Sequence, residues 1–168
     1  SHDVPRALHQ LGDTRLPGPA VDAATISRAR QRLKLATLLQ MSYPGAPTVY
    51  YGDEVGLTGG ADPYNRAPYP WADQGGQPDE CLRADCTRMI ALRIAHPVLR
   101  RGALLAPLHA DDAVLVLARR LGDGAQATWA ITAFNNADGP RTVRVALPEG
   151  APDGRFAAAW GDAPAEAR

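Results

Sequence analysis

Apolar residues recur at helical spacing near the start of the chain. They are Ile26, Ala29, Leu33 and Ala36. This period predicts a helix over residues 22–42, with the apolar face directed at a core. The helix is expected to end at Tyr43-Pro44-Gly45, because proline cannot continue the backbone hydrogen bonds and glycine permits a left-handed turn.

A second helix is predicted to begin near Pro78 and to stop before His96-Pro97, since the residue before a proline avoids the helical region. Residues 1–21 show no period and predict a loop. The β-branched and aromatic run Pro47–Tyr51 predicts a short buried parallel strand. Residues 55–77 then form a long irregular segment, and loops of this length in compact domains are usually functional.

From about Arg101 the pattern changes to short alternating runs that are separated by turn residues. Strands are predicted at 103–108, 113–120, 128–135, 141–147 and 155–160. Connections of hairpin length between such strands predict a small antiparallel β-sandwich. The sequence therefore divides into helix–strand–helix over residues 1–100 and a β domain over residues 101–168.

Composition narrows the function classes. Hydrophobic residues make up 45% and charged residues 21% of the 168 residues, and the formal net charge is zero. A chain without a basic stripe or a long apolar run is not expected to bind nucleic acid or to cross a membrane. Cys81 and Cys86 lie five residues apart in the second predicted helix, which is not a metal-ligand spacing, and one of the two thiols is expected to be buried.

Two pairs of polar residues in loops could carry chemistry. His2 is followed by Asp3, and Asp62 precedes Arg66 by four residues in a glycine-flanked loop that also contains Trp71. The simplest interpretation is exposed residues and a weak surface ion pair. Carboxylates, a guanidinium and aromatic rings close together would also suit a polyhydroxylated ligand, because they offer charge-assisted hydrogen bonds and stacking surfaces.

Three segments, in this order and at these spacings, resemble the α-amylase family, glycoside hydrolase family 13. They are Ser1-His2-Asp3-Val4-Pro5-Arg6, Tyr50-Tyr51-Gly52-Asp53-Glu54-Val55-Gly56-Leu57 and Gly59-Gly60-Ala61-Asp62-Pro63-Tyr64-Asn65-Arg66. The last one is most similar to the cyclomaltodextrinase, neopullulanase and maltogenic amylase branch. The resemblance implies an α/β plus all-β fold: the end of βα unit 7 and unit 8 of a (β/α)8 TIM barrel, followed by an antiparallel β-sandwich known as domain C.

The resemblance also implies residue roles. Asp3 corresponds to the family's carboxylate that stabilises the transition state, and His2 to the histidine that hydrogen-bonds the sugar in the cleaved subsite. Asp62 and Arg66 correspond to residues that hold a glucose further toward the non-reducing end. No cofactor is implied, and the sequence shows no metal site.

The remaining machinery of a retaining glycosidase is not matched by this sequence. That mechanism needs a nucleophilic aspartate and a general-acid glutamate, which in the resembled family lie upstream of the residues seen here. The chain is therefore expected to be a C-terminal part of the enzyme, with domain C incomplete, and to be inactive alone. Asp53 and Glu54 are not expected to substitute, because adjacent residues leaving a strand point to opposite faces.

The expected substrates are maltooligosaccharides, cyclodextrins or starch-like glucans, and the expected partner is the missing N-terminal half of the barrel. Two alternatives remain open: a non-catalytic module that binds carbohydrate or stabilises the enzyme, and a family member that transfers or isomerises sugars. A cytoplasmic location is favoured by the resembled branch.

Overall fold

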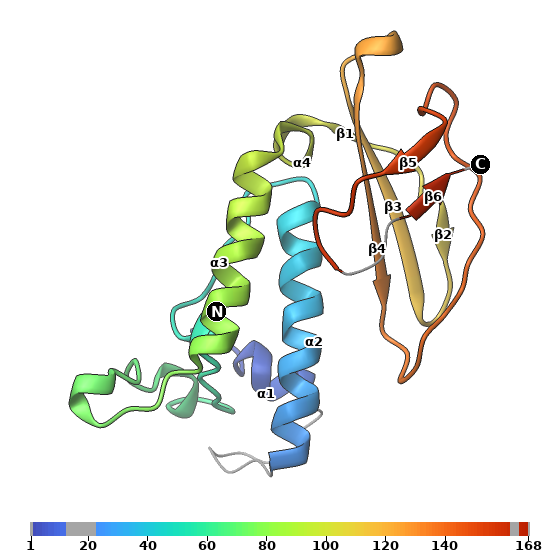
Figure 1. Cartoon of the computed structure of the whole chain (residues 1–168). Coiled ribbons are helices and arrows are strands. Elements are labelled where there is room, and N and C mark those ends of the chain that lie inside the picture. The colour runs from blue at the N-terminus through green and yellow to red at the C-terminus, as the bar shows by residue number, and fades with distance from the viewer. Residues whose placement is uncertain (1, 13–22, 162–164, 168) are drawn as a thin grey trace. The chain divides into compact units, whose positions relative to one another are not determined.

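The computed structural model describes residues 2–12, 23–161 and 165–167. The chain separates into two compact units (Figure 1). Unit 1 comprises Ser1–Met41 and Ala46–Ile90, and unit 2 comprises Ser42–Gly45 and Ala91–Arg168. The predicted division at residue 100 and the sandwich arrangement of the β domain stay predictions, as does the barrel assignment.

Helices supply most of the core of unit 1. Helix α2 spans Ala23–Ser42 and helix α3 spans Glu80–Ala95, close to the predicted ranges. A short helix, α1 at Ala7–Leu11, lies where a loop was predicted. Its formation follows from packing, because Leu8 is buried in one cluster with residues of α2 and α3. The buried members of this cluster are Leu8, Ala29, Leu33 and Leu82.

The strand predicted at Pro47–Tyr51 is wrong. The structure assigns no strand to these residues, although Val49 and Tyr50 are half-buried. A strand is defined by hydrogen bonds to a neighbouring strand, and the described part of unit 1 contains none. The segment leads instead into three single turns of 3-10 helix at Asp53–Val55, Tyr64–Arg66 and Ala72–Gln74.

Unit 2 contains helix α4 and two antiparallel sheets. Helix α4 spans Pro97–Arg101, and its start at the proline confirms the predicted break after α3. The strands are β1 at Ala103–Leu104, β2 at His109–Ala110, β3 at Val114–Leu121, β4 at Thr128–Asn135, β5 at Gly154–Phe156 and β6 at Ala165–Ala167. Strand β3 pairs with β1, β2 and β4, and β5 pairs with β6, all antiparallel. The predicted antiparallel pairing is confirmed.

Three strand predictions in unit 2 need correction. The strand expected at 103–108 is shortened to β1, and β2 begins only after the predicted range; Pro107, between them, has no N–H group to donate to β3. The strand expected at 155–160 is also shorter, because β5 ends at Phe156. Residues 141–147 form no strand. Half-buried Val143 and Val145 do alternate with exposed neighbours as predicted, so the burial period is present without a hydrogen-bonded partner strand.

Two buried arginines organise the inside of unit 2. Arg93 donates hydrogen bonds to the carbonyl oxygens of Tyr43, Gly45 and Leu99. Arg119, on β3, donates to the carbonyls of Ser42, Leu99 and Gly102. Burial lowers the pKa of Arg119 below its usual value, and the nearby Arg93 charge adds to this. These guanidinium groups tie the turn after α2 to α4 and β3.

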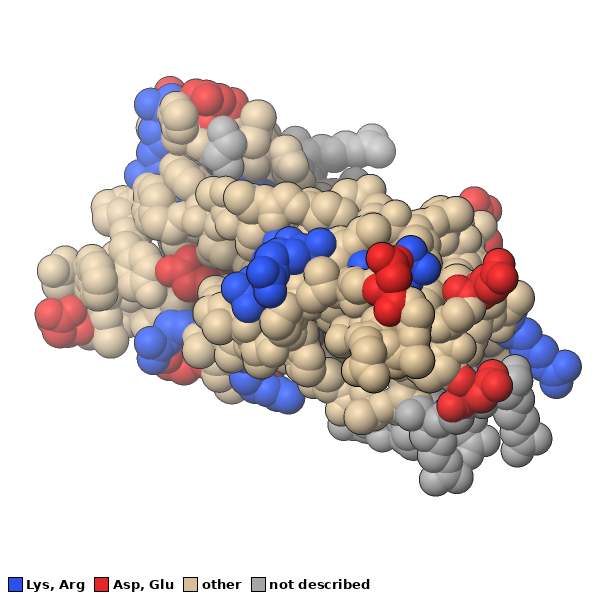
Figure 2. All heavy atoms as spheres, turned by 90° about the horizontal axis from the view of Figure 1, so that it is seen from above, with Lys and Arg blue, Asp and Glu red and all other residues tan. Residues whose placement is uncertain are grey.

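The outer surface shows no concentration of one charge on the face seen in Figure 2, where acidic and basic side chains are scattered among other residues. None of the helices in the described part of the chain is both long enough and apolar enough to span a membrane.

Candidate functional site

The His2-Asp3 pair lies at the start of unit 1, in the turn that precedes α1. The His2 Nε2 and Asp3 Oδ1 atoms are 3.1 Å apart, and the side chains are 65% and 66% exposed. Both side chains are therefore largely open to solvent. A carboxylate in this position can accept hydrogen bonds from a ligand or stabilise a nearby positive charge.

The Asp62–Arg66 pair lies in the loop after Gly59, and the turn Tyr64–Arg66 sets its geometry. Arg66 Nε lies 3.1 Å from Asp62 Oδ1, and both side chains are exposed. The same Nε also lies 3.2 Å from the carbonyl oxygen of His2, which accepts its hydrogen bond. The structure thus brings all four predicted site residues into one chain of contacts across 64 positions of sequence.

The backbone at Gly59 packs closely against the backbone at Tyr64, which brings the start of the loop next to the turn Tyr64–Arg66. A Cβ atom at Gly59 would lie 2.1 Å from the carbonyl oxygen of Tyr64, so only glycine fits there. The Gly59 carbonyl in turn accepts a hydrogen bond of 2.9 Å from the backbone N–H of Arg6.

Asn65 contacts the backbone beside the His2-Asp3 pair and was not identified from the sequence. It is only 1% exposed, between two exposed members of the loop. Its Nδ2 donates to the carbonyl oxygens of His2 at 2.9 Å and of Val4 at 3.1 Å. An asparagine in a loop is most often a surface turn residue, so nothing in the local pattern marks it as buried.

Arg6 is the second residue that sequence reasoning missed. It is fully buried, and its guanidinium carbon lies 4.6 Å from the ring centroids of both Tyr50 and Tyr51. Its Nη1 donates to the Tyr51 carbonyl at 2.6 Å and lies 3.3 Å from Asp53 Oδ1. The only available signal was its place at the end of the His2-Asp3 segment.

The electrostatics around Arg6 are set by burial. Burial raises the pKa of Asp53 above its usual value, and the Arg6 charge and hydrogen bond oppose that rise. Burial also raises the pKa of Tyr50, with the hydrogen bond to Tyr51 adding to it. The contact between Arg6 and Asp53 thus joins the segment before α1 to the residues that directly follow Tyr50 and Tyr51.

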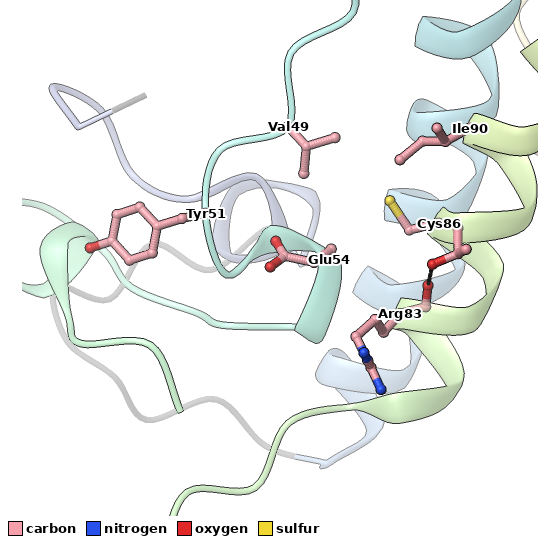
Figure 3. Close-up of a pocket in the computed structure, with 7 residues that line it drawn as sticks. Val49, Tyr51, Glu54, Arg83, Cys86 and Ile90 are labelled. Carbon is pink, nitrogen blue, oxygen red and sulfur yellow. Dashed lines mark hydrogen bonds between the residues drawn. The ribbon is translucent and has the colours of Figure 1, made fainter. Parts of the chain in front are cut away.

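Glu54 follows Asp53 in the 3-10 turn Asp53–Val55 and not at the end of a strand, so the predicted strand geometry does not apply to this pair. Glu54 lines a cavity of about 290 Å³ with Val49 and Tyr51 from its own segment and with Arg83, Cys86, Thr87 and Ile90 from α3 (Figure 3). Burial raises the pKa of the Cys86 thiol, and Glu54 adds to this, which disfavours a reactive thiolate. Cys81 is exposed and Cys86 is buried, which confirms that one of the two thiols is buried.

The described residues contain no group of three or more His, Cys, Asp or Glu side chains placed to hold a metal ion. The arrangement combines exposed carboxylates, an imidazole and a guanidinium. The backbone that carries them is held by hydrogen bonds from the buried residues Arg6 and Asn65. The exposed groups can form several charge-assisted hydrogen bonds to a ligand rich in hydroxyl groups.

Comparisons with known proteins give the relatives of this chain. No protein-family model matches it. It is 39% identical over 124 residues to an amylopullulanase of Thermoanaerobacter thermohydrosulfuricus, which covers 74% of this chain and 8% of the relative. It is 37% identical over 137 residues to a cyclomaltodextrinase of Geobacillus thermopakistaniensis strain MAS1, which covers 81% of this chain and 20% of the relative.

A solved structure agrees with these relatives. A maltogenic amylase from S. marinus matches with a TM-score of 0.62 and 28% sequence identity, covering 86% of this chain and 18% of that chain. The 168 residues therefore span a fifth or less of each of these three proteins.

Proposed function

Because this chain belongs to the α-amylase family of glycoside hydrolases, we propose that it forms part of a retaining enzyme that cleaves α-glucosidic bonds in maltooligosaccharides, cyclodextrins or starch-like glucans. The observation that supports this most strongly is the hydrogen bond from Arg66 Nε to the His2 carbonyl. It joins two exposed polar pairs that are distant in sequence, as a sugar site with several subsites requires.

In this proposal Asp3 acts on the transition state. Retaining cleavage passes through an oxocarbenium-like sugar, and a carboxylate that interacts with it more strongly than with the ground state lowers the barrier. His2 hydrogen-bonds hydroxyl groups of the same sugar, while Asp62 and Arg66 hold a glucose further along. The nucleophile and the general acid are supplied by residues outside this sequence, so the 168 residues alone are expected to be inactive.

The same proposal assigns the two parts of the chain. Residues 1–100 would be the end of βα unit 7 and unit 8 of a (β/α)8 barrel, and residues 101–168 would be domain C. The similarity to the maltogenic amylase over 86% of the chain supports this assignment.

The first test replaces Asp3 by Asn in the protein encoded by the longest open reading frame that contains these residues. We expect turnover of maltohexaose or β-cyclodextrin to fall by about 1,000-fold, with ground-state binding nearly unchanged, since a group that acts only in the transition state changes kcat rather than KM. Asp73→Asn, an exposed carboxylate of the turn Ala72–Gln74, is the matched control. Wild-type turnover in Asp3→Asn would refute the assignment.

The second test concerns the subsite of Asp62 and Arg66. Arg66→Ala should reduce kcat/KM for maltohexaose much more than for maltose, because only the longer substrate reaches that subsite. Equal losses for both substrates would contradict the role.

A binding role without catalysis has one observation in its favour, since the Asp62–Arg66 pair and its contact with His2 are complete within this chain. Calorimetric titration of the full-length protein with maltohexaose, combined with the turnover of Asp3→Asn, decides between a catalytic and a purely binding role. A binding heat that disappears in Arg66→Ala, together with unchanged turnover in Asp3→Asn, would favour the binding module.

A further inference from the structure

We propose that Asn65 is a positioning residue that links the sugar-holding pair Asp62–Arg66 to the alignment of Asp3. The inference rests on the proposed function, in which Asp3 stabilises the transition state. It goes further by naming the group that fixes Asp3 and by predicting how substrate length affects turnover.

The first step is what holds Asp3. Its own side chain, which lies 3.1 Å from His2 Nε2, is 66% exposed, and the next residue, Val4, is 46% exposed, so burial of these side chains contributes little to the shape of the turn. The backbone of the turn is held by Asn65. Asn65 Nδ2 donates to the carbonyl of His2 at 2.9 Å and to that of Val4 at 3.1 Å, one residue before and one residue after Asp3.

The second step is how strongly the two hydrogen bonds from Asn65 hold the backbone. An amide nitrogen carries two hydrogens, and both are used on the two carbonyls that flank Asp3. Asn65 is 1% exposed, so water does not compete for these bonds. A shift of Asn65 therefore moves the backbone on both sides of Asp3 together.

The third step connects the contact to the substrate. Asn65 lies within the turn Tyr64–Arg66 and directly precedes Arg66, which shares the His2 carbonyl with it. A glucose bound by Asp62 and Arg66 restrains this turn. Through Asn65 that restraint is passed to Asp3, so binding energy from a remote sugar is expressed as better alignment at the reacting centre.

The experiment measures kcat and KM for maltohexaose and maltose in the full-length protein. Asn65→Asp keeps the shape and removes both donors, and Asn65→Ala removes the whole amide. Both should lower kcat for maltohexaose by about 100-fold, because a misplacement near 1 Å costs about that factor, while KM changes by less than about threefold. The preference in kcat for maltohexaose over maltose should disappear.

Two control variants separate positioning from general loss of structure. Asn135→Ala removes an asparagine of unit 2 that donates to the carbonyl of Gly139 and has no contact with the residues of the proposal among those described, so it should leave kcat unchanged. Leu33→Ala opens the core cluster of unit 1 and should lower the thermal midpoint while leaving kcat at 25 °C unchanged. A kcat loss in Leu33→Ala that matches the loss in Asn65→Ala would overturn the proposal.

A double-mutant cycle with Asp3→Asn provides the decisive measurement. If Asn65 acts through Asp3, Asn65→Ala should cost less than about threefold in the Asp3→Asn background, whereas independent effects would multiply. Multiplying effects, or wild-type kcat in both Asn65 variants, would overturn the inference while leaving the role of Asp3 intact. Wild-type turnover in Asp3→Asn would instead refute the proposed function and this inference with it.

Discussion

Replacing Arg6 by Met tests how the two segments of the site are held together. The substitution keeps an unbranched apolar stem between Tyr50 and Tyr51 but removes the charge. It deletes the hydrogen bond to the Tyr51 carbonyl and the contact with Asp53, and it leaves that carboxylate only 16% exposed and without this partner.

The magnitude follows from these contacts. Hydrogen bonds with a charged partner contribute about 1.5–3 kcal/mol each, and the contacts with two tyrosine rings add about 1 kcal/mol each. Because the terms are not additive and Met restores apolar packing, we expect a net loss near the 3–5 kcal/mol typical of breaking a buried ion pair. Urea titration of the intact protein, followed by tryptophan fluorescence, measures it.

The matched control is Arg83→Met, which breaks the ion pair with Glu80 on the surface of α3. Both side chains of that pair are more than half exposed, so the loss should be below about 1 kcal/mol. Equal losses for Arg6→Met and Arg83→Met would refute the reasoning, because they would show that the buried guanidinium contributes no more than a surface one.

The pH dependence gives a second check on the same variant. Burial already raises the folded pKa of Asp53 above its reference of 3.8, and Arg6 opposes this. The Asp53 contribution to stability is therefore complete below the unfolded pKa and is lost as the pH rises through the folded pKa. Without Arg6 the folded pKa should rise further, so Arg6→Met should lose more stability than wild type as the pH rises above the reference pKa of 3.8.

Two smaller predictions concern groups outside the site. Cys81 is exposed and Cys86 is buried with a raised pKa, so iodoacetamide should label Cys81 at least tenfold faster; comparable rates in Cys81→Ser and Cys86→Ser variants would contradict this. The hydrogen bond from His109, followed by those from the Val114 and Ala113 amides, lowers the pKa of Asp111 to about 2. Stabilisation by Asp111 is then present above 3.8 and lost as the pH falls through about 2. His109→Ala should raise the carboxyl midpoint in an NMR titration, and an unchanged midpoint would exclude His109 as the main cause.

Sequence patterns located those elements whose form depends on neighbouring residues. Helix α2 and strand β4 lie close to their predicted ranges, because the helical period and the turn residues around β4 act locally. The strand predictions failed at two places, residues 141–147 and Pro47–Tyr51, for the same reason. Their apolar alternation or β-branched composition is compatible with a strand, but a strand also needs a partner, which local pattern does not reveal.

The candidate site shows the same difference between features that local sequence reveals and features that depend on distant residues. The exposed polar pairs His2-Asp3 and Asp62–Arg66 were identified by motif, whereas Arg6 and Asn65 were missed. Arg6 contacts residues 45 and 47 positions away, and Asn65 contacts residues 61 and 63 positions away. Their roles arise from burial by distant segments, which no window of sequence around either residue contains.

The two buried arginines of unit 2 have a consequence for how the sequence can vary. Every contact described for Arg93 and Arg119 ends on a backbone carbonyl, and every residue type carries that group. Tyr43 could therefore be exchanged in a deep mutational scan without loss of its bond, whereas either arginine should tolerate no substitute. Gly45 and Gly102 are exceptions among the partners. Gly45 has a φ of 115°, which favours glycine, and a Cβ atom at Gly102 would lie 2.5 Å from the Val98 carbonyl oxygen. The turn after α2 should thus tolerate exchange of Tyr43 but not of Gly45.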